Sequence, residues 1–133
     1  MGFSVDLAGQ GDFEIADVFS FSASIDGGAS QTLFTITTSD TGTQTYIYDD
    51  GSSVTLNDPL NVNGGSLLNN TFTNFSTGIA GTGSVLTLRF DGIQNSGAEL
   101  FAFDNIQITS VPEPGSLTFI GLISIAWMSR RRR

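Results

Sequence analysis

Oxygen-bearing side chains near the two ends of the predicted folded body are the residues best suited to hold a metal ion. Asp104 shares strand parity with the apolar residues Ala102 and Ile106, so a regular strand would turn its carboxylate toward the interior. A buried carboxylate is costly unless it is paired or coordinates a metal. Calcium takes hard oxygen ligands of this kind. The candidate calcium ligands are Glu14, Asp17, Asp104 and Asn105.

Two other environments would satisfy Asp104 without a metal. Its carboxylate could accept backbone N–H bonds at a β-bulge, or it could pair with Arg89, the only basic residue before the last four residues. Glu14 and Glu99 are the glutamates of residues 1–110 and would have to form any glycosidase pair. Nothing in their sequence spacing supports that chemistry, so we expect no enzymatic activity.

Residue types that are missing from the sequence exclude several functional classes. The chain has no cysteine and no histidine, which excludes disulfides, zinc–thiolate sites, cysteine nucleophiles and a Ser-His-Asp triad. Thirteen acidic residues against five basic ones give a net charge of −8, and all of the acids lie at or before Glu113. Phosphate backbones would repel such a surface, so we expect no nucleic-acid partner.

The elements that would position these side chains are short β-strands. Hydrophobic and polar residues alternate with a period of two in most segments of residues 1–110, as in Phe19, Phe21, Ala23 and Ile25. Groups of Asp, Asn and Gly that favour turns separate the alternating segments. Antiparallel sheets with one wet face give this pattern, and two of them packed face to face would bury the phenylalanines. We therefore predict an all-β domain, an antiparallel β-sandwich of the jelly-roll type.

The last 23 residues differ from the body and form a second predicted segment, 111–133. A stiff Val-Pro-Glu-Pro-Gly motif at 111–115 precedes an apolar run at 116–129, and four arginines at 130–133 end the chain. We predict a single transmembrane helix over 116–129, which is short for a bilayer unless arginine side chains reach up to the interface. The positive-inside rule keeps the arginines in the cytoplasm and puts the body on the outer side. The expected anchor residues are Leu117, Phe119, Ile120, Leu122, Ile123, Ile125 and Trp127.

This tail resembles the PEP-CTERM sorting signal, a bacterial element that is recognised by the membrane protease-transpeptidase exosortase. The resemblance implies export, retention in the membrane by the tail, and later processing near the Pro-Glu-Pro motif. It also implies a bacterium that makes extracellular polysaccharide. The alternative, a core helix with a solvated charge run, is disfavoured because core helices rarely end a chain in four adjacent arginines. The matching residues are the motif Val111, Pro112, Glu113 and Pro114, the helix, and the basic stop Arg130, Arg131, Arg132 and Arg133.

A second resemblance covers the body of the chain. Residues 11–17 (Gly-Asp-Phe-Glu-Ile-Ala-Asp) and 101–108 (Phe-Ala-Phe-Asp-Asn-Ile-Gln-Ile) are similar to parts of concanavalin-like and MAM-like jelly-roll modules. In those modules a closing strand with Asp-Asn-Ile lies near an early acidic pair, which implies the structural calcium site. Such modules carry one or two more strands before the position of Phe3, and residues 1–7 lack the features of a signal peptide. We therefore expect an N-terminally truncated chain.

Together these features predict a non-enzymatic protein of the bacterial envelope or extracellular matrix. We expect it in the inner membrane with its body facing outward, and at the cell surface or in the matrix after processing. Its expected partners are the membrane, exosortase and exopolysaccharide. The alternative is a calcium-dependent carbohydrate-binding module that acts on exopolysaccharide.

Overall fold

The computed structural model describes residues 1–110, and these residues form strands and turns with no helix. The prediction of an all-β body with antiparallel sheets is confirmed for this part of the chain. The predicted transmembrane helix at 116–129 falls in 111–133, outside the described residues. Among the residues that are described, none belongs to a helix long and apolar enough to cross a membrane. The strands are β1 (Gly2–Gln10), β2 (Val18–Ile25), β3 (Gln31–Thr38), β4 (Thr43–Ile47), β5 (Ser53–Asn57), β6 (Leu60–Val62), β7 (Ser66–Leu67), β8 (Thr73–Gly78), β9 (Leu86–Ile93) and β10 (Leu100–Thr109).

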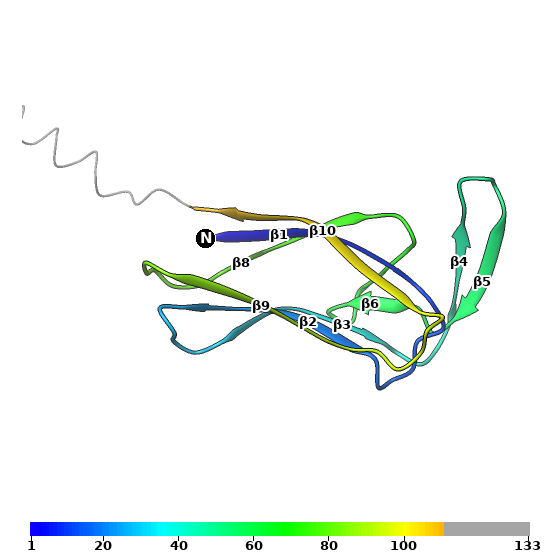
Figure 1. The fold of residues 1–133 in the computed structure, drawn as a ribbon, viewed down its shortest axis with the longest axis horizontal. Helices are drawn as coiled ribbons and strands as arrows, with labels where there is room; N and C mark the ends of the chain where they lie inside the picture. The colour runs from blue at the N-terminus through cyan, green and yellow to red at the C-terminus, as the bar shows by residue number, and fades with distance from the viewer. Residues whose placement is uncertain (111–133) are drawn as a thin grey trace, which may run out of the picture.

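Two sheets face each other and enclose the core. One has the strand order β10-β1-β8 and the other the order β7-β6-β3-β2-β9, and their strand pairs are antiparallel (Figure 1). A separate hairpin of β4 and β5 stands at one end of the two layers (Figure 1). The arrangement is sandwich-like, which is the usual way for two half-apolar sheets to hide their inner faces from water.

The core follows from the period-two alternation of the two central strands. Phe3, Val5 and Leu7 of β1 are buried, and the residues between them, Ser4 and Asp6, are only partly buried. Strand β2 repeats the pattern, and the Phe21 ring lies 5.8 Å from the Phe3 ring between centroids. The Phe19 ring stacks at 4.3 Å on Phe101 of the opposite sheet. Aromatic packing across the two layers therefore holds the sheets together.

A β-bulge in β10 changes which of its residues face the core. Ser4 pairs with Gln107 but Asp6 pairs with Asp104, so two residues of β10 lie opposite Val5. Asn105, in the bulge, has a φ of 51°, in the left-handed region. Residues opposite each other in an antiparallel pair point to the same face. The inward residues are therefore Phe101 and Phe103 before the bulge and Ile106 and Ile108 after it.

The bulge corrects the expected orientation of Asp104. Regular alternation predicted that its carboxylate points inward with Ala102 and Ile106, and this is wrong. Asp104 lies opposite Asp6 on the outer face of the β10-β1-β8 sheet, and it is exposed. One inserted residue moves every later side chain to the other face, because the side-chain period of a strand is two.

One side of the sandwich is only partly closed, and we call it the open edge. Strands β9 and β10 are edge strands of their sheets, and the Phe90 ring of β9 lies 4.9 Å from the Phe103 ring of β10. Side chains on the inner faces there stay between 36% and 46% exposed. They are Leu88, Phe90, Phe103, Ile106 and Ile108.

Substitutions of Asn105 should show how strongly the bulge depends on a left-handed residue. Asn105→Gly keeps the required φ and loses only the amide contacts of the side chain. Asn105→Val should be less stable than Asn105→Gly by roughly 1–2 kcal/mol, because a β-branched residue is strained at positive φ. Urea unfolding of both variants measures the difference, and equal unfolding free energies would contradict a left-handed bulge residue.

Candidate metal centre

Three carboxylates converge at one end of the sandwich, and we call Glu14, Asp17 and Glu99 the acidic cluster. One carboxylate oxygen from each residue lies within 4.8 Å of the others. Glu14 and Asp17 belong to the loop between β1 and β2, whereas Glu99 ends the loop between β9 and β10. The cluster therefore joins loops that are about eighty residues apart in the sequence.

The first loop is held in a tight turn by bonds between Glu14 and Asp17. The Asp17 backbone N–H donates to the Glu14 carbonyl oxygen at 2.8 Å, and the Glu14 N–H donates to Asp17 Oδ2 at 2.8 Å. The backbone N–H of Asn95, in the second loop, donates to Asp17 Oδ1 at 3.1 Å. Asp17 is fully buried, so its carboxylate fixes the positions of both loops.

Glu99 is placed by its position next to β10 and by the glycine it contacts. The Gln94 side-chain amide donates to the Glu99 carbonyl oxygen at 2.7 Å, which closes the second loop. A Cβ atom on Gly11 would lie 2.9 Å from Glu99 Cγ, too close for any other residue without a shift. Glycine at position 11 therefore lets the two loops approach each other.

The Glu99 carboxylate is buried without the partners that such a group needs. Its side chain is 6% exposed, and neither carboxylate oxygen accepts a hydrogen bond of regular geometry from the described residues. Burial is the largest cause of a rise in the pKa of Glu99 to about 7, and a hydrogen bond with Glu14 and the negative charges of Asp17 and Glu14 contribute to that rise. The Ser96 backbone opposes the rise in pKa only in part. In the folded chain, Glu99 thus needs either a proton or a cation.

A second unsatisfied polar group lies near the same glycine. Tyr46 is fully buried, and its hydroxyl has no hydrogen bond of regular geometry among the described residues. Burial raises the pKa of Tyr46, and the Gly11 backbone partly offsets that rise. Two polar side chains that lack good partners therefore contact Gly11 or lie close to it.

The predicted calcium ligands are divided between two places. The structure brings Glu14 and Asp17 together, but it places Asp104 and Asn105 on the outer face of β10. The Asn105 backbone N–H donates to Asp104 Oδ1 at 2.7 Å, so the alternative of a carboxylate that caps a bulge is confirmed. The Asn105 side chain donates to Asp6 Oδ2 at 3.1 Å. Asp104 therefore accepts a backbone N–H at the bulge, and it is not in the acidic cluster.

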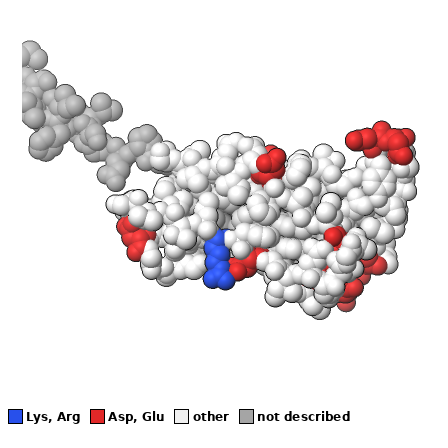
Figure 2. All heavy atoms as spheres, viewed as in Figure 1, with Lys and Arg blue, Asp and Glu red and all other residues white. Residues whose placement is uncertain are grey.

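Arg89, the other partner considered for Asp104, bonds to a neighbour on its own strand. Its guanidinium donates to Asp91 Oδ1 at 2.6 Å, and both side chains are largely exposed. Figure 2 shows this one basic side chain among acidic ones on the face in view. The residues predicted for sorting, membrane anchoring and the basic stop lie in 111–133, outside the described residues.

The calcium ligands predicted from the sequence do not include Glu99. The sequence suggests Glu99 only as the partner of Glu14 in a glycosidase pair, which their spacing does not support. The structure does bring these two glutamates together, but Glu99 is 6% exposed, whereas a glycosidase needs both carboxylates to flank a sugar. The feature that brings Glu99 to the cluster is the pairing of Gln10 with Leu100, which places Glu99 next to Gly11. That register follows from the three-dimensional fold and not from spacing along the chain.

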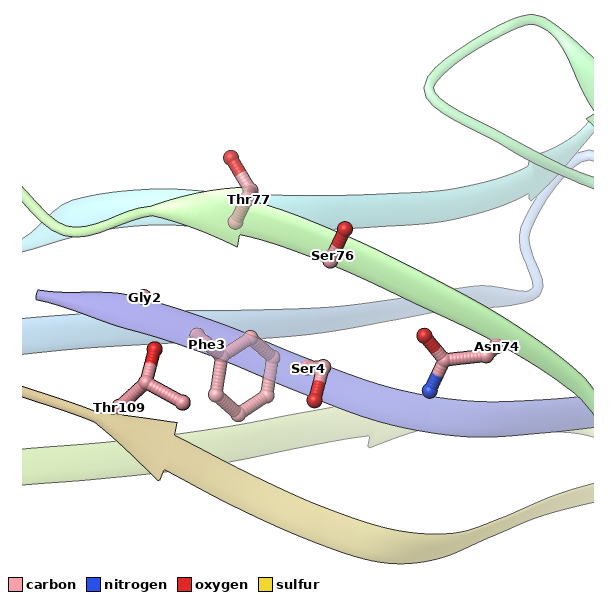
Figure 3. A pocket seen from close by; sticks show the side chains of 7 residues that line it. All are labelled: Gly2, Phe3, Ser4, Asn74, Ser76, Thr77 and Thr109. Atoms are coloured by element: carbon pink, nitrogen blue, oxygen red, sulfur yellow. The ribbon is translucent and has the colours of Figure 1, made fainter.

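A separate polar pocket lies on the β10-β1-β8 sheet (Figure 3). None of its lining residues is charged, and Phe3, the one aromatic residue among them, is buried. The lining residues are Gly2, Phe3, Ser4, Asn74, Ser76, Thr77 and Thr109. Such a surface can hydrogen-bond a neutral polar ligand, but the described lining residues offer no exposed aromatic ring on which a sugar could stack.

Comparison with protein-family profiles, with curated proteins and with solved structures finds no match for this chain. The acidic cluster and the polar pocket must therefore be interpreted from their own geometry.

Without divalent cations, the stability of the folded chain should fall as Glu99 loses its proton. Its pKa is near 4.5 in the unfolded chain and about 7 in the folded chain, so the folded form binds the extra proton between these values. The contribution of Glu99 is thus complete below about pH 4.5 and is lost as the pH rises through 7. Glu99→Gln cannot ionise, and it should remove this part of the pH dependence.

Urea unfolding of the full chain in a chelating buffer from pH 4 to 8 measures the effect. The difference in unfolding free energy between wild type and Glu99→Gln should grow in favour of the variant as the pH rises. Asp49→Asn, which changes an exposed acid in a turn, is the matched control and should leave the slope unchanged. Parallel curves for wild type and Glu99→Gln would show that the Glu99 pKa is not raised.

Proposed function

We propose that this chain is an exported bacterial envelope or extracellular-matrix protein that exosortase sorts through its C-terminal tail. The observation that carries the proposal is the order of three segments at the end of the chain. A Pro-Glu-Pro motif at 112–114, an apolar run at 116–129 and four terminal arginines follow one another without interruption. Each segment suits a physical role in this order: prolines favour a backbone that a protease can bind as a strand, the apolar run suits lipid, and the arginines fix orientation.

The short distance between the last strand of the described body and the motif supports this proposal. Strand β10 stops at Thr109, and the motif begins two residues later at Val111. The buried cluster of the body is assembled from residues between Phe3 and Ile79, with Phe101 packed against it. A protease that recognises an extended segment would thus find its substrate directly after a strand that pairs with β1.

The charge of the body supports an outward-facing position. Within residues 1–110 Arg89 is the only basic residue, and it pairs with Asp91. Basic residues next to a membrane segment stay in the cytoplasm, whereas acidic residues contribute little to orientation. The four terminal arginines therefore determine the topology: the tail is held in the inner membrane and the body faces outward. After processing, the body is at the cell surface or in the matrix.

We further propose that the body is a jelly-roll module with a non-enzymatic role. The two facing antiparallel sheets and the non-consecutive neighbours β10, β1 and β8 favour that topology. The alternative function is a calcium-dependent carbohydrate-binding module that acts on exopolysaccharide. The uncharged polar pocket favours this alternative, because hydroxyl and amide groups suit a neutral saccharide (Figure 3).

A tail fusion tests the sorting proposal. Residues 111–133, placed behind a secreted reporter in a bacterium with an active exosortase, should hold the reporter in the membrane and then be cleaved near the motif. Replacing Pro112 and Pro114 with alanine should abolish cleavage but leave membrane retention, because the apolar run is intact. Cell fractionation and immunoblotting measure both outcomes, and a reporter that stays soluble and uncleaved would refute the proposal.

A further inference from the structure

We propose that Glu14, Asp17 and Glu99 form a calcium site that ties the β1–β2 loop to the β9–β10 loop. The inference is independent of the sorting function, because it concerns only the described body. It also differs from the ligand set predicted from sequence, because Glu99 replaces Asp104 and Asn105.

The spacing of the oxygens suits a calcium ion. One oxygen from each carboxylate lies within 4.8 Å of the others. Calcium–oxygen distances are about 2.3–2.6 Å, so two ligands on opposite sides of the ion are roughly 5 Å apart. An ion placed between these oxygens could therefore contact all three carboxylates.

The unpartnered Glu99 side chain is the observation that points to a ligand. A cluster of acids alone would be unremarkable on so acidic a surface. Glu99, however, is 94% buried, and neither of its carboxylate oxygens accepts a hydrogen bond of regular geometry from the described residues. A buried carboxylate without partners is strongly destabilising, and a cation would supply the missing interaction.

The neighbouring residues leave a cation as the natural counter-charge. Arg89 is the only basic side chain of residues 1–110, and it is bonded to Asp91. The Asp17 carboxylate already accepts two backbone N–H groups, which orient it but do not neutralise the cluster. Glu14 is exposed, so water molecules could complete the coordination from that side.

The ligand chemistry selects calcium over other metals. All three side chains offer hard oxygen atoms, and the chain has neither the histidine nor the cysteine that zinc and copper prefer. Magnesium requires near-ideal octahedral geometry, whereas calcium accepts irregular arrangements such as carboxylates from two loops. The bound ion would hold together loops that are otherwise linked here mainly through the bond from Asn95 to Asp17.

Thermal unfolding of the full chain in a neutral detergent tests the site. After chelator treatment at pH 7.5, calcium added to about one hundred times its dissociation constant should raise the unfolding temperature of wild type by at least roughly 5 °C. Glu99→Gln removes the charge repulsion and should fold without calcium, yet its unfolding temperature should not respond to calcium. Isothermal titration of wild type should give one calcium per chain, and Glu14→Gln should bind it more weakly.

Asp104→Asn is the matched control, because it alters an acid of the same β-sandwich outside the acidic cluster. It should keep the full response to calcium. The proposal fails if calcium leaves wild type unchanged, if Glu99→Gln responds as wild type does, or if Asp104→Asn loses the response. A magnesium response as large as the calcium response would overturn the assignment to calcium.

Discussion

The antiparallel pairing of β1 with β10 is the constraint on which most of this structure depends. It runs from Gly2 opposite Thr109 to Gln10 opposite Leu100, and it joins the two ends of the described chain. Its register places Phe3, Leu7 and their partners on one inner face, and its last pair brings Glu99 next to Gly11. Both the core and the acidic cluster therefore follow from one ladder of hydrogen bonds.

The acidic cluster shows how a fold can assemble an unfavourable charge arrangement. The Asp17 carboxylate accepts hydrogen bonds from backbone N–H groups of two loops, so its position is fixed. Gly11 admits the Glu99 side chain into the remaining space, where burial and two neighbouring carboxylates raise its pKa. The free energy of such a site depends on what neutralises it, so solution conditions become part of the stability of the fold.

The sequence allowed the general architecture to be predicted, because period-two alternation is a local signal. The buried residues Phe19, Phe21 and Ala23 follow that pattern directly. Alternation could not locate the bulge at Asn105, which the sequence offered only as one alternative for Asp104, so regular alternation placed Asp104 on the wrong face. Glu99 was not predicted to join the acidic cluster for a related reason, because its proximity to Glu14 exists only through strand register. The interpretation of the tail rests on residue order alone, and its predicted helix lies outside the described residues.

The open edge has a consequence for how these molecules behave in a crowded solution. On their outer sides, strands β9 and β10 pair with no other strand of residues 1–110, and they lie beside half-exposed apolar side chains, an arrangement that invites pairing with another copy. Long-range repulsion between acidic bodies opposes such encounters, but it weakens as the screening length falls from about 8 Å at physiological salt to about 3 Å at 1 M. Colloidal stability of this body is thus coupled to salinity, and concentrated brine would favour its self-association.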